Sequence, residues 1–298
     1  MSNDTSSGEP RSCPPPDPNP RGPSRYEVPK GAVDTHAHVI GLPPRYPFVA
    51  SRSFTPPEAP LENYLAMLDA TGMTFGALTQ VSVHGTDNRL LIEALQAEPK
   101  RLRGVGVVPA DAPERELTAL KDAGVVALRL NVLYGGGMGL DALERYGALC
   151  RDIGWHLQFL LDARQLPELA SKLSKLPVEF LVDHLGHMPA SEGVSHPGFR
   201  TLVSLVRDGA WVRFSGAFRI SVKGPPYADT IAFAHALNAA SPDRCLWGSD
   251  WPHVANYGPM PNVGDLLDLL ADWVPDEAAR HKLFVENPCR LYGFPPPG

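Results

Sequence analysis

The sequence predicts a single (β/α)₈ TIM barrel, and three observations support this prediction. Eight short runs of apolar, often β-branched residues alternate with eight segments in which apolar residues recur every three or four positions. The short runs are apolar at successive positions, which is typical of parallel strands buried on both faces. A chain of 298 residues has the length of one such barrel. An open doubly wound sheet is the alternative, but it would be expected to carry a glycine-rich turn after its first strand, where this chain has His-Ala-His.

The expected strands are the apolar runs, which end at polar residues or glycine. They are Ala32–Thr35, Phe75–Val81, Arg103–Val108, Val125–Asn131, Trp155–Leu161, Val178–Asp183, Ala210–Phe214 and Arg244–Gly248. The expected helices lie between them and keep their apolar residues on one face, as Leu90, Leu91 and Leu95 do in the second one. They are Glu62–Ala70, Asn88–Ala97, Glu114–Ala123, Leu140–Ile153, Pro167–Leu176, Gly198–Arg207, Tyr227–Ala239 and Val263–Trp273.

The first thirty residues differ from the rest of the chain. Met1–Lys30 is rich in Pro, Ser, Gly and Asp and has almost no aliphatic residues. Such a segment cannot bury enough apolar surface to offset the entropy lost on ordering it. We therefore expect residues 1–30 to form an extended or disordered arm without a chemical role, and residues 31–298 to form the barrel.

Two histidines end the first expected strand. His36 and His38 are two residues apart, and side chains at positions i and i+2 of a strand point to the same face. Two neutral imidazoles side by side can each offer a nitrogen lone pair to one cation. The pair by itself is weak support for a metal site, because any two histidines can fall at this spacing.

Two other strand ends strengthen that interpretation. Asp250 follows the last expected strand, and His184 follows the run Phe180–Asp183. In a barrel the carboxyl ends of all strands meet at one face, where the active sites of this fold lie. A carboxylate at the end of a buried strand is costly unless a cation or hydrogen bonds compensate it. We therefore expect His36, His38, His184 and Asp250 to converge on one site.

Further polar residues follow the same strand ends and are candidates for substrate binding. Arg129 could alternatively pair with a carboxylate, and His84 could be an ordinary loop residue. Asp183 should point to the opposite side of its strand from His184 and is expected to be structural. The candidates are Ser82, His84, Arg129, Asn131, Arg219 and His253.

Composition excludes several classes of function. The net charge is −6 without a basic stripe, so nucleic acid is not expected as a partner. No apolar run has the length of a membrane span, and there is no apolar signal core. The four cysteines are far apart and without paired metal spacing, which favours a reducing cytoplasm. The sequence leaves open whether the protein forms a homo-oligomer.

Several spaced motifs resemble the amidohydrolase superfamily. His-x-His, a later His and a final Asp at strand ends follow its pattern. More closely, the chain resembles the branch that contains 2-pyrone-4,6-dicarboxylate lactonase, 4-sulfomuconolactone hydrolase and D-galactarolactone isomerase. The similarity extends over nearly all of Gly31–Phe294. Its segments are Val33–Val39, Tyr46–Phe48, Phe54–Pro56, Val83–Arg89, Asp183–Gly186, Trp247–His253 and Asn287–Tyr292.

The resemblance implies at most one divalent metal ion, with Zn²⁺ the first choice. Its ligands would be His36, His38 and Asp250, with His184 either a fourth ligand or a base that orients water. Many members have another histidine on the fifth strand, and binuclear members add a carboxylated lysine. Here that strand has only His156, near its start, and no lysine. A mechanism without metal, in which Asp250 alone is the base, therefore stays open.

The resemblance also implies a small anionic lactone as substrate, in the catabolism of aromatic compounds. Arg129 and Arg219 would hold its carboxylate or sulfonate, Asp250 would accept the proton of the attacking water, and His184 or His253 could relay it. The dicarboxylate lactonase has additional arginines and tyrosines at positions that align here with Phe54, Gly135, Leu160 and the further binding candidate His187.

These replacements, together with the local Tyr134–Met138 loop, favour a 4-sulfomuconolactone-type substrate over 2-pyrone-4,6-dicarboxylate. Decarboxylation and isomerisation of a sugar lactone are the alternative reactions on the same scaffold, and a barrel that merely binds a sugar lactone without catalysis is a further alternative. Release of carbon dioxide without incorporation of water would distinguish a decarboxylase. The intact His-x-His and Asp250 favour activation of water over isomerisation.

Overall fold

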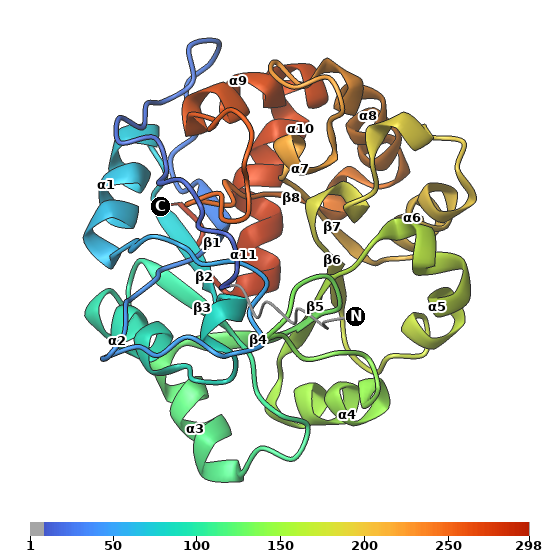
Figure 1. Ribbon diagram of the computed structural model, residues 1–298. Helices are drawn as coiled ribbons and strands as arrows, with labels where there is room; N and C mark the ends of the chain where they lie inside the picture. The colour runs from blue at the N-terminus through green and yellow to red at the C-terminus, as the bar shows by residue number, and fades with distance from the viewer. Residues whose placement is uncertain (1–8, 298) are drawn as a thin grey trace, which may run out of the picture.

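The computed structural model describes residues 9–297 and confirms the predicted barrel (Figure 1). Eight parallel strands pair in sequence order, and helices surround them. The strands are β1 (Val33–Ala37), β2 (Phe75–Thr79), β3 (Leu102–Gly106), β4 (Val125–Asn131), β5 (His156–Leu160), β6 (Phe180–Val182), β7 (Trp211–Phe214) and β8 (Cys245–Trp247). Each overlaps its predicted range, and most are shorter than predicted because the polar strand ends turn into the loops of the active face.

The eight predicted helices are present with shifts of a few residues at their ends. They are α1 (Leu61–Thr71), α2 (Arg89–Ala97), α3 (Glu114–Ala123), α4 (Leu143–Ile153), α5 (Leu166–Leu173), α6 (Pro197–Arg207), α8 (Ile231–Ala240) and α9 (Val263–Trp273). The sequence analysis missed three short helices, namely α7 (Ala217–Ile220), α10 (Glu277–His281) and α11 (Asn287–Tyr292). None of these three spans more than six residues, which is too short for a clear apolar period.

The barrel closes between β1 and the segment that follows β8. A single parallel bridge joins Ala37 to Trp251. The backbone N–H of Asp250 donates to the carbonyl of His36 at 2.9 Å, and the N–H of His38 donates to the carbonyl of Trp251 at 2.8 Å. The seam that closes the barrel therefore fixes the two histidines beside the carboxylate.

Strand β1 carries an irregularity that turns two neighbouring side chains inward. Its register with β2 shifts between Asp34 and Ala37. Both Thr35 and His36 contact the same buried side chain, that of Arg213, inside the barrel. A bulge breaks the strict alternation of a strand and re-aims the side chains near it. Alternation alone would have turned either Thr35 or His36 outward.

The N-terminal segment that precedes β1 lies along the outside of the barrel (Figure 1). Arg25 forms an ion pair with Asp272 of α9 at 2.7 Å, and the N–H of Ser24 donates to Asp268 at 2.6 Å. Nearer the start, the N–H of Cys13 donates to the carbonyl of Thr55 at 2.8 Å. The described part of the predicted arm is thus extended and bound to the barrel, whereas residues 1–8 lie outside the described residues.

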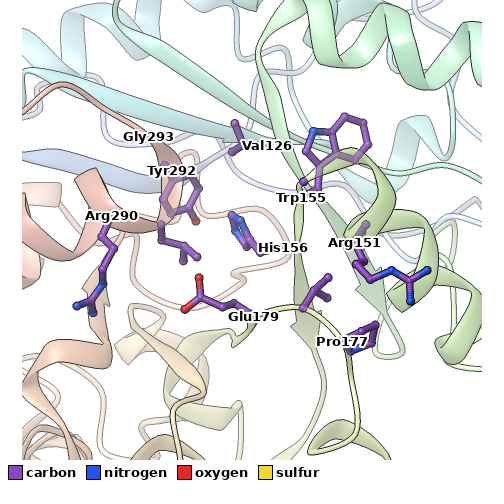
Figure 2. Close-up of a pocket in the computed structure, with 13 residues that line it drawn as sticks. Val126, Arg151, Trp155, His156, Pro177, Glu179, Arg290, Tyr292 and Gly293 are labelled. Carbon is purple, nitrogen blue, oxygen red and sulfur yellow. The ribbon is translucent and has the colours of Figure 1, made fainter.

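The opposite, amino-terminal end of the barrel contains a cavity of about 460 Å³ (Figure 2). In the close-up, Arg151 and Arg290 lie on opposite sides, with His156 and Tyr292 between them. The amide nitrogen of Gln158 lies 3.0 Å from Nε2 of His156 and 2.8 Å from the Tyr292 hydroxyl. This end carries none of the predicted site residues, in keeping with the rule that conserved chemistry of barrels belongs to the other face.

Among residues 9–297, no helix combines the length and the apolar character that crossing a bilayer requires.

The buried imidazole of His156 should make stability depend on pH. Burial, with a smaller contribution from Arg213, lowers its pKa to about 3. The unfolded chain binds a proton near pH 6.5, whereas the folded chain does not until the pH approaches 3, so stability is lost as the pH falls through this window. His156→Gln should flatten the dependence by up to about 1.4 kcal/mol per pH unit. Urea unfolding from pH 7 to 4.5 measures it, and an unchanged slope would contradict the burial of a neutral imidazole. The exposed His235, replaced by Gln, is the matched control.

Candidate active site

Four predicted residues converge at the carboxyl-terminal face of the barrel. Oδ1 of Asp250 lies 3.6 Å from Nε2 of His36 and 3.9 Å from Nε2 of His38. Its other oxygen, Oδ2, lies 3.9 Å from Nε2 of His184. All four side chains are buried. The structure therefore brings the ends of β1, β6 and β8 together around one carboxylate.

The backbone at two of these residues leaves the extended conformation. Asp250 has φ 59° and His184 has φ 53°, which is the left-handed region that non-glycine residues rarely adopt. Such backbone conformations persist only where the surroundings enforce them, and they cluster at functional sites. In both cases the strand has ended just before, so the side chain turns over the mouth of the barrel.

This local geometry corrects the expectation for Asp183, which was predicted to point away from His184. Strand β6 ends at Val182, so the alternation of a strand no longer applies to the two residues that follow. Asp183 faces the barrel interior, where it forms ion pairs with Arg129 at 2.9 Å and with Arg213. Its structural role was anticipated, but its direction was wrong.

Arg213 is a central residue that the sequence analysis did not identify. It lies in β7 and is fully buried. Its Nη1 donates to Nδ1 of His36 at 2.8 Å, and its Nη2 donates to the Tyr292 hydroxyl at 2.6 Å. A charged residue between the apolar neighbours Val212 and Phe214 was the only available signal. Lys and Arg are almost never fully buried without a partner, which here is Asp183.

The contact that Nδ1 of each histidine makes determines whether its Nε2 carries a proton or a lone pair. Arginine only donates, so Nδ1 of His36 must accept, and the neutral ring carries its proton on Nε2. His38 donates from Nδ1 to the carbonyl of Thr79 at 2.7 Å, which leaves a lone pair on Nε2. Nδ1 of His184 lies 2.8 Å from the hydroxyl of Ser215, which can donate or accept.

Burial and nearby arginines keep the imidazoles neutral. Burial, followed by Arg213, holds the pKa of His36 well below its usual range. Burial lowers the pKa of His38 to about 3. Burial also raises the pKa of Asp250, against the opposing effect of Arg219. Two neutral imidazoles thus lie beside a carboxylate that is paired with Arg219, an arrangement typical of functional sites.

A small cavity of about 20 Å³ opens onto the cluster, which is room for about one water molecule. Besides His38, six of the predicted binding or catalytic residues line it, namely Ser82, Arg129, Asn131, His184, Arg219 and Asp250. Phe54, Val81, Tyr134, Leu160 and Val254 complete the wall. His84 and His253, the other two binding candidates at strand ends, do not line this cavity. His187, the candidate inferred from the resemblance, does not line it either.

Each of these three histidines is held elsewhere. His84 lies beside Phe48, with its Nδ1 3.3 Å from the carbonyl of Pro47. His253 packs its ring edge-on against Phe218. The ring of His187 is edge-on to that of Tyr134, with the two ring centroids 6.4 Å apart. A direct substrate contact from them would require the surrounding loops to move.

The two arginines of the cavity differ in how they are engaged. Nε of Arg219 donates to Oδ2 of Asp250 at 2.5 Å, and its Nη2 donates to the carbonyl of Val254 at 3.0 Å. Arg129 uses Nη2 for Asp183, while its Nε is buried without a partner. An unpartnered buried donor is costly. Arg129 thus has an N–H without a partner, and its side chain lines the cavity, where an anion could accept from it.

The cluster fits a divalent metal ion. Among residues 9–297, His36, His184 and Asp250 form a group whose ligand atoms all lie within 4.8 Å of one another. Nε2 of His36 and Oδ1 of Asp250 are buried without partners and face each other. Ligand atoms of a tetrahedral zinc site lie roughly 3.3 Å apart, and Oδ1 of Asp250 lies 3.6 Å from Nε2 of His36, so these two atoms would move closer by a few tenths of an ångström. A neutral imidazole binds a cation through Nε2 only when its proton is on Nδ1, so a metal ion at Nε2 of His36 would require the contact of Nδ1 with Arg213 to change.

Comparison with known proteins agrees with this geometry. Residues 33–294 match the protein family described as Amidohydrolase. The chain is 39% identical over 277 residues to a 4-sulfomuconolactone hydrolase of Rhizobium radiobacter. The aligned residues make up 91% of this chain and 93% of that protein. It is 34% identical over 286 residues to a 2-pyrone-4,6-dicarboxylate hydrolase of Comamonas testosteroni, covering 92% and 93% of the two chains.

A solved structure shares the fold closely. The apo crystal structure of a protein from Agrobacterium tumefaciens superposes with a TM-score of 0.84 at 30% identity. The superposed residues make up 93% of this chain and 100% of the other chain. The similarity therefore extends over most of this chain.

Removing the central guanidinium should destabilise the barrel strongly. Arg213→Met leaves the buried carboxylate of Asp183 with one cation and takes the donor from His36. Breaking a buried pair in this way costs about 3–5 kcal/mol of the free energy of unfolding. Chemical denaturation measures the loss, and Arg200→Met on the exposed face of α6 is the matched control, expected within about 0.5 kcal/mol of the unchanged protein. A loss below about 1 kcal/mol for Arg213→Met would mean that the pair contributes little.

Proposed function

The chain belongs to the amidohydrolase family, and from this premise we propose that it hydrolyses a small anionic lactone. The observation that carries the proposal is a buried carboxylate, Asp250, that faces an unpartnered imidazole nitrogen beside two arginines. The two hydrolases to which the chain is similar are named for lactones that bear anionic groups. Water activation next to an anion site is the chemistry that such a reaction needs.

Asp250 is the proposed general base. It lies at the centre of the histidine cluster, and its raised pKa brings it closer to the neutral range in which a base works best. It takes a proton from the water whose oxygen bonds to the lactone carbonyl carbon. A divalent ion at His36, His184 and Asp250, with Zn²⁺ the best match to these donors, would lower the pKa of that water and polarise the carbonyl.

The same proton completes the reaction. When the bond between the carbonyl carbon and the ring oxygen breaks, the leaving oxygen needs a proton, which Asp250 can return. His184 lines the cavity and its Nε2 lies 3.9 Å from Asp250, so it is the better placed relay. His253 is the less suitable candidate, because its ring packs against Phe218 outside the cavity. No net change in protonation of the protein results.

Arg129 is the proposed primary contact of the anionic group. Its free N–H can donate a charge-assisted hydrogen bond to a carboxylate or sulfonate oxygen. Its other nitrogen stays on Asp183, so the guanidinium need not move to bind the ligand. Arg219 adds positive charge at the same wall, although its Nε is bound to Asp250.

The lining favours a 4-sulfomuconolactone-type substrate over 2-pyrone-4,6-dicarboxylate. Phe54 and Leu160 line the cavity with apolar surface, at positions where the dicarboxylate lactonase was expected to carry polar contacts. A planar dicarboxylate held at both ends would leave one carboxylate against this apolar wall. Desolvation of an unpaired carboxylate is costly. A place in aromatic catabolism follows from this substrate class.

The cysteines support a reducing compartment, and we infer the cytoplasm. All four are free, and Cys150 and Cys245 are fully buried in the barrel. Free buried thiols pack as small apolar groups and need no oxidising environment.

Removal of a metal ion tests the water-activating step. Dialysis against a strong chelator should abolish hydrolysis, and Zn²⁺ should restore it. Asp250→Asn should lower kcat about 10²–10⁴-fold, because the amide cannot accept the proton of the water. Thermal unfolding shows whether that variant keeps its fold. Full turnover by demonstrably metal-free protein would assign the step to Asp250 without metal.

Substitution of the two arginines tests the anion site. Arg129→Met should weaken transition-state binding of the anionic lactone by about 2–5 kcal/mol and leave a neutral lactone little changed. Arg219→Met should impair both substrates, because it also releases Asp250. Values of kcat/KM on both lactones measure this difference. Equal losses for Arg129→Met on the two substrates would exclude its anion contact, and faster hydrolysis of the pyrone dicarboxylate would reverse the substrate order.

A further inference from the structure

We propose that Tyr134 is a further substrate-binding residue, whose hydroxyl donates to the anionic group and sets which anionic lactones the site accepts. The proposal rests on the proposed function, because it names the group that completes the anion site of that lactonase. Tyr134 follows β4 and lines the same cavity as Arg129, Arg219 and Asp250.

The contacts of Arg219 show where an anion can enter. All three nitrogens have partners, with Nε on Asp250 at 2.5 Å and Nη2 on the carbonyl of Val254 at 3.0 Å. The third, Nη1, reaches the hydroxyl of Tyr134 at 3.4 Å. Hydrogen bonds weaken with length, and this contact is beyond the usual range for an N–H donor. The tyrosine is therefore the partner that a substrate anion most easily replaces.

Replacement of that contact creates a complete set of donors. An oxygen that takes the Arg219 Nη1–H frees the Tyr134 hydroxyl from its role as acceptor. The hydroxyl can then donate its proton to the same anion, since tyrosine both donates and accepts. Arg129, whose Nε–H has no partner, lines the same cavity and can supply a third donor. Three donors from separate elements would surround one carboxylate or sulfonate.

Three consecutive glycines fix the position of Tyr134. An added Cβ at Gly135 would lie 1.9 Å from the carbonyl oxygen of Ser51, and one at Gly136 would lie 2.2 Å from that of Ser82. Gly136 also has φ +92°, which side chains rarely tolerate. The loop backbone therefore lies against two neighbouring loops at distances that only glycine allows.

Hydrogen bonds hold this loop in place. Oδ1 of Asn131 accepts from the N–H groups of Leu133 at 2.9 Å and Tyr134 at 3.0 Å. The N–H of Gly135 donates to the hydroxyl of Ser53 at 2.7 Å. Asn131 was expected to bind substrate, but its carbonyl oxygen is used here to shape the loop. Asn131 therefore helps to position the backbone of Tyr134.

The aromatic ring of Tyr134 lies between two residues that distinguish this chain from the dicarboxylate lactonase pattern. Its ring is edge-on to Phe54 at 5.8 Å and to His187 at 6.4 Å. Gly135, the next residue, is a third such position. Three of the four replaced positions thus surround Tyr134. The Tyr134 hydroxyl is a neutral donor, which can satisfy one anionic group but cannot neutralise a second.

Tyr134→Phe tests the proposal, because it keeps the ring and removes only the hydroxyl. The anionic lactone should show a KM raised about tenfold with kcat changed less than about threefold, and a neutral lactone should be unaffected. Tyr26→Phe is the matched control, since it removes a hydroxyl that donates to the carbonyl of Leu267, far from the cavity. Thermal unfolding of each variant establishes that the fold is kept.

Binding of furan-2-carboxylate, measured by calorimetry, separates this proposal from the proposed function. This ring carboxylate contains no lactone, so its Kd reports on the anion site alone, with furan-2-carboxamide as the neutral comparison. Tyr134→Phe should raise the Kd of the carboxylate about tenfold and leave that of the amide unchanged. A tyrosine effect on this Kd in a protein that hydrolyses no lactone would support the anion site and refute the lactonase. Changes below about twofold in both KM and Kd would overturn the role of Tyr134.

Discussion

The guanidinium of Arg213, buried at the centre of the barrel, is the interaction on which the rest of the structure depends. A buried cation without a partner is prohibitively costly, so its position requires the carboxylate of Asp183 beside it. Its remaining N–H groups reach His36 from β1, Gln158 from β5 and Tyr292 from α11. One side chain thus connects Gln158 and Tyr292 in the barrel interior to a histidine of the active site. The tautomer of that histidine follows from a contact made deep in the core.

This arrangement sets the electrostatics of the site. The buried ion-pair cluster contains three arginines and two carboxylates, in the pairs of Arg129 and Arg213 with Asp183 and of Arg219 with Asp250. The imidazoles beside it are neutral, because burial and the arginines lower their pKa values. In a medium of low dielectric the excess positive charge attracts an anion strongly. The neutral ring of His38 keeps a lone pair on Nε2 that is available to a metal ion, so the anion and cation preferences of the site occupy different atoms.

The sequence was sufficient for the barrel and for the convergence of His36, His38, His184 and Asp250, because strand ends of a parallel barrel meet at one face. It was insufficient wherever the backbone leaves the regular strand. Alternation failed at Asp183, one residue beyond the end of β6. Long-range partners are equally hidden from local patterns, since only the folded chain brings Arg213 and Asp250 to residues distant in sequence.

The size of the cavity explains why the weakest contact matters most for binding. A space of about 20 Å³ cannot hold a lactone, so binding must displace groups that now occupy the mouth. Phe54 and Val254 belong to loops joined through Cys13, which donates to Thr55 at 2.8 Å and accepts from Ala255 at 3.2 Å. Across the cavity, the 3.4 Å contact of Tyr134 with Arg219 is the longest hydrogen bond of the lining. The group that is most easily displaced is therefore also the one with a hydroxyl to offer the incoming anion.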